Sequence, residues 1–347
     1  MKLLVTGGAG FIGSNFIRFL LSERPDTEIV NMDALTYAGN LERLSGLKDE
    51  RRLEFVKGNI ADPGFISEVM SAYSFDAVVN FAAETHVDRS LHIGVTAFIA
   101  ANVGGVQVLL DACREHGVER FVQISTDEVY GSLGREGSFT EKSPIEPNNP
   151  YAATKAGADM LVRAAHKSYG LDTVITRCSN NFGPCQFPEK LIPLMIANAL
   201  EDKPLPVYGD GMHVRDWIYV ADHCAAVDLA LRRAEPGSVY NIGGEHDVPN
   251  LEIVRSILRL LDKPESLIRY IEDRPGHDRR YAMDASLITE ELGWRRRYDF
   301  EEALKSTVDW YVNNRPWWER VRTGEYRDFY EKLYAKRLDE GEAGKSE

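Results

Sequence analysis

Cysteine is scarce in this chain: four occur among 347 residues. None belongs to a Cys-x-x-Cys pair, and no cluster of cysteine and histidine has the spacing of a zinc site. The sequence therefore predicts neither a disulfide scaffold nor a metal centre. We favour free thiols in a reducing compartment for Cys113, Cys178, Cys185 and Cys224.

Positively charged residues are also few compared with acidic ones. The chain has 41 lysines and arginines against 54 acids, a net charge of -13, so we expect no nucleic acid and no anionic membrane as partner. No apolar run approaches the roughly 20 residues that span a bilayer. The four residues between Lys2 and Gly7 are too few for a signal-peptide core. We therefore expect a cytoplasmic protein.

Short apolar runs alternate with helical periodicity over the first two-thirds of the chain. Continuous Val, Ile, Leu and Phe runs are typical of strands that are covered on both faces. The runs that predict strands are Lys2–Thr6, Glu28–Met32, Leu53–Val56, Asp76–Phe81, Arg120–Ser125 and Thr173–Arg177. The segments that predict helices between them are Ser14–Glu23, Phe65–Tyr73, Ala97–His116 and Tyr151–Tyr169. This alternation predicts an α/β fold with a doubly wound parallel sheet of Rossmann type.

After residue 180, prolines and glycines interrupt this alternation, and helices recur at Ala221–Arg233, Leu251–Leu261 and Phe300–Asn313. We expect a smaller, mixed α/β C-terminal lobe that binds substrate over the carboxyl edge of the sheet. The predicted division is a cofactor-binding domain over 1–180, to which 217–243 returns, a substrate lobe over 181–216 and 244–332, and a charged tail over 333–347.

A glycine-rich loop, Gly7-Gly8-Ala9-Gly10-Phe11-Ile12-Gly13, joins the first strand to the first helix. Glycine lets the backbone turn tightly and lets a pyrophosphate approach the helix N-terminus, where free N–H groups attract it. Asp33 ends the second strand, 20 residues after Gly13. A carboxylate there accepts hydrogen bonds from a ribose diol and repels a 2′-phosphate. The context predicts NAD rather than NADP, and a purely structural turn is the weaker alternative.

Tyr151 is the one tyrosine of 15 that has a lysine, Lys155, four positions later. On a helix this spacing places both side chains on one face. A phenol has a pKa near 10, and we expect the Lys155 ammonium and a nicotinamide cation to lower it toward the range of a general base. Alone, the pair would also suit a surface helix. However, Thr126-Asp127-Glu128 follows a predicted strand at the sheet edge where such folds bind ligands.

Together these features resemble the extended short-chain dehydrogenase/reductases and, within them, the dTDP-glucose 4,6-dehydratases. The resemblance runs from Lys2 to about Asn314, and the Thr-Asp-Glu step is its most specific element. Related epimerases carry only the hydroxyl there, whereas related GDP-mannose dehydratases and UDP-glucuronate decarboxylases lack this pair of acids. The segments that carry the resemblance are Phe81–Ser90, Ser125–Gly131, Arg177–Pro184, Phe187–Pro193 and Asp273–Tyr281.

The resemblance implies a lyase of deoxysugar biosynthesis that uses bound NAD. It implies oxidation of dTDP-glucose at C4, elimination of water across C5 and C6, and return of the hydride to C6. Tyr151 would take the 4-hydroxyl proton, Thr126 would hydrogen-bond O4, and Lys155 would hold the nicotinamide ribose. Glu128 would remove the C5 proton and Asp127 would protonate the leaving 6-hydroxyl. From the residues alone, either acid could take either role.

The resemblance also implies two sets of binding residues. Those for the cofactor are Gly7, Gly10, Phe11, Ile12, Gly13, Asp33, Leu35, Thr36, Asn59, Ile60, Ala82, Ala83, Tyr151, Lys155 and Asn181. Those for the nucleotide sugar are Thr85, Thr126, Asn180, Lys190, Leu191, Pro206, Tyr208, Arg215, Asn250, Arg274 and His277. Two positions depart from the family pattern and concern only cofactor contacts: Asn59 replaces a usual aspartate, and Ala101 a common threonine.

Two other functions stay open. One is a nucleotide-sugar 4-epimerase of the same superfamily, which shares the cofactor and the oxidation step; the paired acids Asp127 and Glu128 argue against it. The other is a catalytically inactive nucleotide-sugar-binding member; intact Thr126, Tyr151 and Lys155 argue against it. The residues leave the nucleobase and the final deoxysugar open.

By analogy with the superfamily, we expect a homodimer through the helices Ala97–His116 and Tyr151–Tyr169. The first helix has more apolar side chains than one buried face needs, namely Phe98, Val103, Val106, Leu109 and Leu110.

Overall fold

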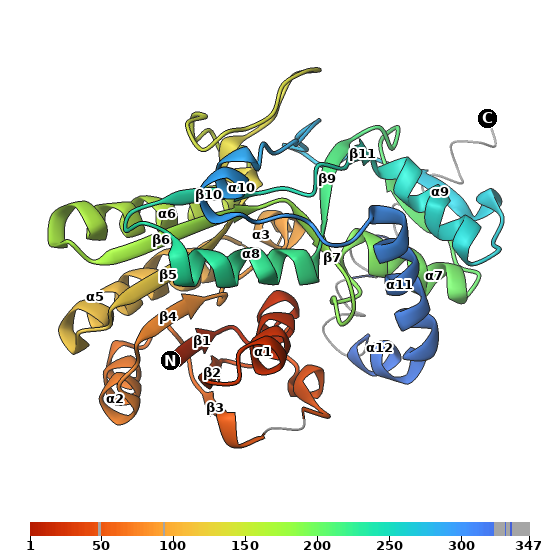
Figure 1. Cartoon of the computed structure of the whole chain (residues 1–347). Coiled ribbons are helices and arrows are strands. Elements are labelled where there is room, and N and C mark those ends of the chain that lie inside the picture. The colour runs from red at the N-terminus through yellow and green to blue at the C-terminus, as the bar shows by residue number, and fades with distance from the viewer. Residues whose placement is uncertain (48–49, 93, 323–329, 331–333, 335–347) are drawn as a thin grey trace.

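The computed structural model describes residues 1–47, 50–92, 94–322, 330 and 334 of the chain (Figure 1). Its centre is a seven-stranded parallel sheet with the order β10-β6-β5-β4-β1-β2-β3. The strands expected from the sequence are present, with ends shifted by no more than one residue. The predicted doubly wound parallel sheet is therefore confirmed. Its strands are β1 (Lys2–Thr6), β2 (Glu28–Asp33), β3 (Leu53–Lys57), β4 (Ala77–Asn80), β5 (Arg120–Thr126), β6 (Asp172–Cys178) and β10 (Val239–Ile242).

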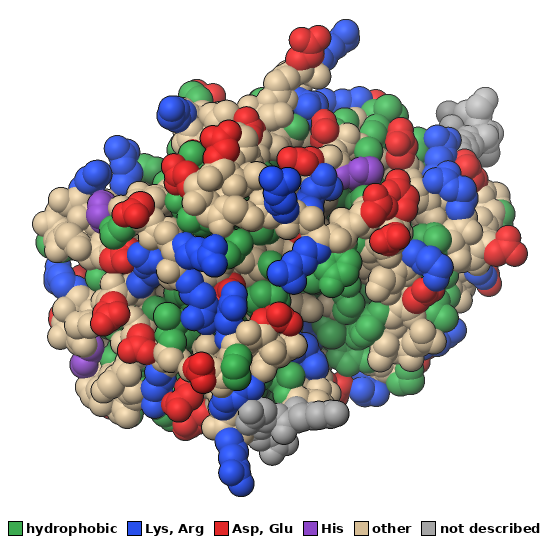
Figure 2. Space-filling view, in the orientation of Figure 1, with side chains coloured by type: hydrophobic (Ala, Val, Ile, Leu, Met, Phe, Trp, Pro, Cys, Tyr) green, Lys and Arg blue, Asp and Glu red, His purple; other side chains and the backbone are tan. Residues whose placement is uncertain are grey.

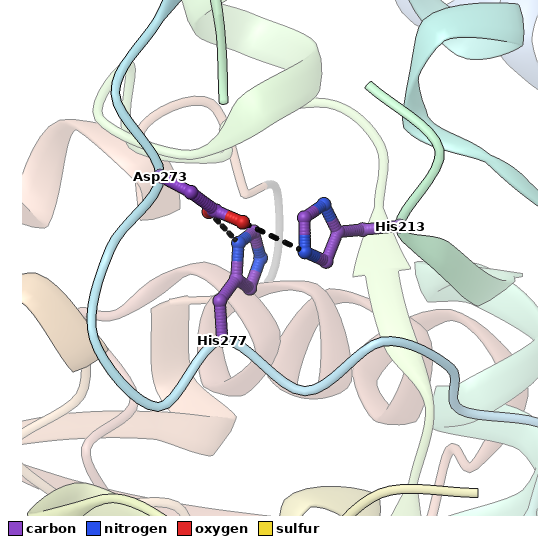
Figure 3. Close-up of side chains that lie close together, drawn as sticks. All are labelled: His213, Asp273 and His277. Carbon is purple, nitrogen blue, oxygen red and sulfur yellow. Dashed lines mark hydrogen bonds and ion pairs between the residues drawn. The ribbon is translucent and has the colours of Figure 1, made fainter. Parts of the chain in front are cut away.

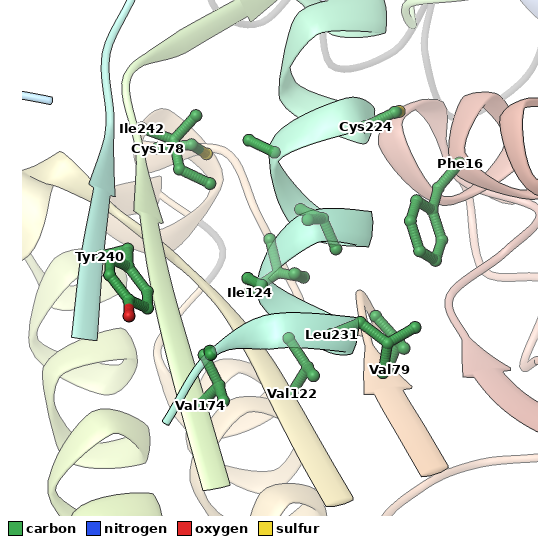
Figure 4. Packing of buried hydrophobic residues seen from close by; sticks show 14 of the residues in the cluster. Phe16, Val79, Val122, Ile124, Val174, Cys178, Cys224, Leu231, Tyr240 and Ile242 are labelled. Atoms are coloured by element: carbon green, nitrogen blue, oxygen red, sulfur yellow. The ribbon is translucent and has the colours of Figure 1, made fainter. Parts of the chain in front are cut away.

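Helices cover both faces of this sheet because strand side chains alternate between the faces. Leu3 packs on one face and Leu4 on the other. The first face is covered by α1 (Phe11–Glu23), α8 (Val220–Arg233) and α10 (Ser286–Leu292), and the second by α2 (Pro63–Tyr73), α5 (Val106–His116) and α6 (Pro150–Tyr169). Figure 4 shows the first core, where Phe16 and Leu231 lie against the strands that carry Val79 and Val122. Burial on both faces explains the apolar runs of the inner strands, whereas the edge strand β3 is mostly exposed.

The helix expected over Ala97–His116 is present but is not uniform. It consists of α4 (Thr96–Phe98), a π-helical segment over Ile99–Gly105, and α5. A Cβ on Gly105 would lie 2.5 Å from the Ile60 side chain, so the segment closely approaches the loop after β3. π-Helical segments are frequent at functional sites, and this one contributes Ala100 and Ala101 to the wall of the cavity described below.

By length and composition, Thr96–His116 is the one described helix that could cross a membrane, with a mean hydropathy of 1.4. The expectation that no apolar run approaches that length is therefore wrong for this segment. The finding is weak evidence of a span, because apolar helices that pack within a fold have the same composition. Here 44% of the apolar window is buried, and the segment packs against α2 and α6. Acidic and basic side chains are interspersed over the face shown in Figure 2.

The chain after β6 adds two small sheets, β11-β9-β7 and β12-β8. Their strands are β7 (Asn180–Phe182), β8 (Leu205–Tyr208), β9 (Val214–Tyr219), β11 (Asp247–Pro249) and β12 (Ile268–Ile271). They share a core with α7 (Leu191–Leu200), α9 (Asn250–Leu260), α11 (Phe300–Asn313) and α12 (Arg315–Val321). In the sequence between β9 and β11, the chain returns to the larger sheet: α8 packs on α1, and β10 joins the seven strands. The domain boundaries remain a prediction, and the tail over 333–347 lies outside the described residues except for 334.

The remaining described elements are short. The helix α3 (Val87–His92) follows β4, and four single-turn helices complete the chain: η1 (Leu41–Leu44), η2 (Glu50–Arg52), η4 (Asp127–Tyr130) and η5 (Glu265–Leu267). Two of them matter for the site, because η1 follows the cofactor strand β2 and η4 directly continues β5.

Candidate active site

A cavity of about 480 Å³ opens at the carboxyl ends of β1, β2, β4, β5 and β6. Open α/β sheets bind their ligands at this edge. All of the predicted cofactor and catalytic residues line the cavity except Leu35, together with Thr85, Asn180 and Lys190 of the predicted substrate residues. The other predicted substrate residues, all within the described part of the chain, are not in its wall: Leu191, Pro206, Tyr208, Arg215, Asn250, Arg274 and His277.

The glycine-rich loop has the shape that a dinucleotide needs. Gly7 has a φ of +69°, and a Cβ there would lie 2.5 Å from the backbone nitrogen of Ala82. A Cβ on Gly13 would lie 2.4 Å from the carbonyl oxygen of Gly7. Gly10 precedes α1 without a side-chain cap, and the first turn of α1 has no acid. Its N–H groups and helix dipole therefore suit a pyrophosphate, and the loop fits NAD.

Asp33 ends β2 and is 9% exposed. Its Oδ2 accepts a hydrogen bond from the N–H of Ala9 at 2.9 Å, and its Oδ1 accepts one from the N–H of Leu35 at 2.8 Å. Burial raises the pKa of Asp33, against the lowering effect of these N–H groups and of the Arg43 guanidinium. Leu35 therefore orients the carboxylate instead of lining the cavity. A carboxylate has further lone pairs that can accept from a ribose diol.

Tyr151 and Thr126 meet at the end of β5, where their side chains are hydrogen-bonded. Lys155 lies one turn further along α6 and donates from Nζ to the carbonyl oxygen of Ile124 at 2.6 Å. Burial raises the pKa of Tyr151 well above 10, and the charge of Glu128 raises it further. Burial and the neighbouring carboxylate thus act against the lowering that we expected from Lys155 together with a nicotinamide cation, and that lowering stays a prediction. Burial also lowers the pKa of Lys155 itself.

Asp127 is the more deeply buried of the two acids, with 2% of its surface exposed. Thr126 Oγ1 donates to Asp127 Oδ1 at 3.1 Å, and Asp127 Oδ2 has no hydrogen-bond partner among the described residues. Burial, followed by the charges of Glu128 and Asp216, raises the pKa of Asp127 well above its usual value. Half-buried Glu128 accepts at Oε2 from Asn149 Nδ2 at 3.1 Å. The environment thus favours a protonated Asp127 beside Glu128.

Three cations lie near the acids. Arg215 is buried, Lys190 and Arg274 are partly buried, and the charge of Glu128 acts on all three. Arg274 is 3.5 Å from Asp88 Oδ1, and Arg215 donates to the carbonyl oxygen of Asp278 at 2.9 Å. Guanidinium groups suit a diphosphate because they bind two oxygens at once.

A further ionisable cluster, His213, Asp273 and His277, lies on the loops beside β8 and β12 (Figure 3). His277 Nδ1 is 2.6 Å from one oxygen of Asp273, and His213 Nε2 is 3.1 Å from the other. The imidazoles stack with centroids 3.7 Å apart and 14° between the planes. Burial and the charges of Arg274 and Arg215 lower the pKa of His277 to about 2. Because the rings are parallel, their nitrogen lone pairs do not converge on one point as metal ligands do, and the cluster is a hydrogen-bonded triad.

Several cavity residues were not predicted from the sequence, among them Arg43, Cys178, Ser179 and Glu189. Cys178 and Ser179 lie at the end of β6, so their position at the carboxyl edge could have indicated them. Arg43 and Glu189 lie outside the sheet, where no periodicity marks them. Glu189 accepts hydrogen bonds from the Tyr37 hydroxyl at 2.9 Å and from Arg89 Nε at 3.2 Å. His213 was likewise missed, because only the fold brings its loop beside His277.

Comparison with known proteins gives a consistent result. The GDP-mannose 4,6 dehydratase family matches residues 4–307. The dTDP-glucose 4,6-dehydratase of Xanthomonas campestris is 51% identical over 93% of this chain and 97% of that protein. The dTDP-glucose 4,6-dehydratase of Streptomyces venezuelae, crystallised with NAD, is 49% identical over 92% of this chain and all of that chain, with a TM-score of 0.89.

The epimerase alternative has a more distant likeness. The UDP-glucose 4-epimerase of Thermus thermophilus, crystallised with NAD, has a TM-score of 0.84 at 30% identity, over 90% of this chain and all of that one. The fold alone therefore does not separate the two activities, whereas sequence identity does. This chain belongs to the dTDP-glucose 4,6-dehydratase family of NAD-binding Rossmann-fold enzymes.

Proposed function

We propose that this enzyme converts dTDP-glucose into dTDP-4-keto-6-deoxyglucose with a bound NAD that is regenerated in each turnover, and that it supplies deoxysugar biosynthesis. The observation that carries the proposal is the adjacent pair Asp127 and Glu128 in the wall of the NAD cavity, with the pKa of Asp127 raised by burial. A 4-epimerase needs the oxidation step but no acid pair for loss of water. The comparisons give that alternative no better support.

The oxidation depends on Tyr151. Its hydroxyl shares a hydrogen bond with Thr126, so both groups can face one sugar hydroxyl, Thr126 orienting O4 while Tyr151 accepts its proton. NAD, when bound, accepts the C4 hydride, returns it to C6, and carries the nicotinamide charge that favours an ionised Tyr151. The ammonium of Lys155 is held between α6 and β5 by its hydrogen bond to the carbonyl oxygen of Ile124, and it adds positive charge beside the cofactor.

The elimination depends on the two acids. A ketone at C4 acidifies the proton on C5, and Glu128 removes that proton. Asp127, protonated because burial raises its pKa, donates its proton to the departing 6-hydroxyl, which leaves as water. Two neighbouring carboxyl groups in different protonation states are what such a step requires. The environment of the pair thus supports the role of acid for Asp127.

The nucleotide is held by groups around this centre. Lys190, Arg215 and Arg274 neutralise the diphosphate, which is needed in a protein of net charge -13. His277, fixed by Asp273, is a neutral hydrogen-bonding group beside them. The remaining residues that we propose to contact the nucleotide sugar are Thr85, Asn180, Leu191, Pro206, Tyr208 and Asn250.

Mass spectrometry of the product tests this function. Incubation with dTDP-glucose should give a nucleotide sugar lighter by one water, with no net consumption of NAD. When the hydride adds to C6, C5 takes up a proton from Glu128, so in deuterated water, where Glu128 exchanges its proton with solvent, the product should carry deuterium at C5. A product of unchanged mass that is the 4-epimer would support the epimerase instead, and NADH that accumulates with the product would contradict cofactor recycling.

We also propose a homodimer formed by Thr96–His116 and α6. Four of the five residues first used for this expectation do not support it, because Phe98, Val106, Leu109 and Leu110 are buried inside the protomer, whereas Val103 is half-buried. The support comes instead from exposed Ile99, Met160 and Tyr169, whose exposed fractions are 50%, 41% and 61%.

Sedimentation at micromolar concentration tests the dimer. Met160→Glu should give a monomer, because it places a charge in the apolar contact. Leu260→Glu, at an equally exposed position on α9, should leave the dimer intact. A monomeric wild-type protein would contradict the proposal.

We propose that the enzyme works in the cytoplasm. All four cysteines are free, and three of them are buried. A reducing compartment keeps such thiols unmodified. Fractionation of the source cells would test this, and activity confined to the membrane fraction would contradict it.

A further inference from the structure

Arg43 is a buried charge in the cofactor half of the molecule. It lies in η1, lines the cavity and is 1% exposed. Within the described part of the chain, no carboxylate lies at ion-pair distance from it, and Asp33 is the carboxylate whose charge acts on it. Burying an unpaired guanidinium is costly, so its contacts require an explanation.

The guanidinium binds backbone oxygens from three separate segments. Its NH1 group donates to the carbonyl oxygen of Ala9 at 2.8 Å and to that of Ala38 at 2.5 Å, and Nε donates to that of Cys185 at 2.9 Å. Its Cζ atom lies over the ring of Trp317 in α12, 5.4 Å from the centroid.

Each of these segments contributes to the cavity wall. Ala9 belongs to the glycine-rich loop, Ala38 itself lines the cavity, and Cys185 precedes the lining residues Gln186 and Phe187. Ala9 is held from both sides, since its N–H donates to Asp33 and its carbonyl oxygen accepts from Arg43. A single side chain thus fixes the loop that meets the pyrophosphate, the loop after the ribose-binding carboxylate, and a loop from the second half of the chain.

We propose that Arg43 is a positioning residue for the cofactor. It holds three segments of the NAD cavity wall in their binding geometry and places an uncompensated positive charge beside a site for an anionic dinucleotide. Loops that are ordered before binding cost less entropy when the ligand arrives. The buried charge is compensated when a cofactor with two phosphates binds. The inference rests on the proposed use of NAD but not on the dehydration step.

Isothermal titration calorimetry of NAD into cofactor-free protein tests this role. Arg43→Met keeps the bulk but removes the charge and all donors. It should weaken NAD binding about 10- to 100-fold, as expected for the loss of one or two charge-assisted hydrogen bonds. It should raise the KM for NAD in proportion and leave kcat at saturating NAD nearly unchanged. Arg43→Lys, which keeps the charge but not the planar fork, should lie between Arg43→Met and the wild type.

Arg52→Met is the matched control. Arg52 also donates to three carbonyl oxygens of the same half of the molecule, those of Arg24, Thr27 and Leu21, but does not line the cavity. Its loss should lower thermal stability and leave the Kd for NAD unchanged.

A Kd of Arg43→Met for NAD within twofold of the wild-type value, or an equal loss of NAD affinity in both variants, would overturn the proposal. If Arg43→Met does not fold, unchanged NAD binding by Arg43→Lys has the same consequence. Failure of dTDP-glucose turnover with normal NAD binding by the wild type would count against the proposed function only.

Discussion

The two walls of the cavity, one for the cofactor and one for the reaction, are lined by different kinds of chemical group. The cofactor wall is mostly backbone: glycines at 7, 10 and 13, an uncapped helix N-terminus, and one carboxylate held by two N–H groups. The reaction wall is made of buried ionisable side chains, Tyr151, Lys155 and Asp127, whose pKa values all depart from their usual range because of burial.

The difference follows from what each wall does. A dinucleotide needs a fixed shape and N–H donors, which a backbone supplies without cost in side-chain entropy. Proton transfers need groups whose charge can change, and burial tunes their pKa values. We therefore expect substitutions in the reaction wall to lower turnover and substitutions in the cofactor wall to lower affinity.

Tyr151→Phe should have the largest effect. It removes the group that we propose as proton acceptor, and such a group typically supplies about 10² to 10⁴ in rate. Steady-state kinetics should show a drop of that size in kcat, with the Kd for NAD and the melting temperature little changed. Tyr240→Phe removes the hydroxyl of another buried tyrosine, which donates to Glu291 and does not line the cavity, and this variant should retain turnover. Near-normal turnover by the Tyr151 variant would assign the base to another group.

Gly7→Ala should disrupt the shape of the glycine-rich loop in the cofactor wall. Gly170 is the matched position, because its φ of +71° resembles that of Gly7 but a Cβ there meets no atom within 4 Å. Both substitutions should cost about 1–2 kcal/mol of stability from backbone strain. The Gly7 variant should also lose NAD affinity by about tenfold or more, since its Cβ overlaps the backbone of Ala82. Equal NAD affinity in the two variants, measured by calorimetry, would show that the loop shape is not what binds the cofactor.

His223 gives a smaller, pH-dependent effect. It is fully buried beside Asn181, and burial lowers its pKa to about 3. Between pH 6.5 and 3 the unfolded chain binds a proton that the folded chain does not, so stability falls as pH falls, by about 1.4 kcal/mol per unit. His223→Gln should flatten the urea-unfolding free energy against pH by that slope, whereas exposed His92→Gln should not. An unchanged slope in the His223 variant would show that its neutrality does not limit acid stability.

The cofactor wall could be predicted from the sequence, since glycine spacing, a strand before it and an acid 20 residues later all follow from local rules. The reaction wall was only partly predictable. The residues Thr126, Asp127 and Glu128 could be located at a strand end. The raised pKa of Asp127, however, depends on burial, on Glu128 and on Asp216, which is distant in sequence. For the same reason the rise that burial causes in the pKa of Tyr151, in the protein without cofactor, could not be predicted. Arg43 was not predictable at all, because its partners come from three loops and α12.

The most direct test separates oxidation from elimination in one variant. The double substitution Asp127→Asn with Glu128→Gln keeps size and removes both titrating groups. On mixing with dTDP-glucose it should develop the near-ultraviolet absorbance of the reduced cofactor, while formation of the 4-keto-6-deoxy product falls by roughly 10² or more. Elimination of water at near wild-type rate would contradict the assignment of the acids. Failure to reduce the cofactor in a variant that melts normally would show that the acids serve oxidation instead.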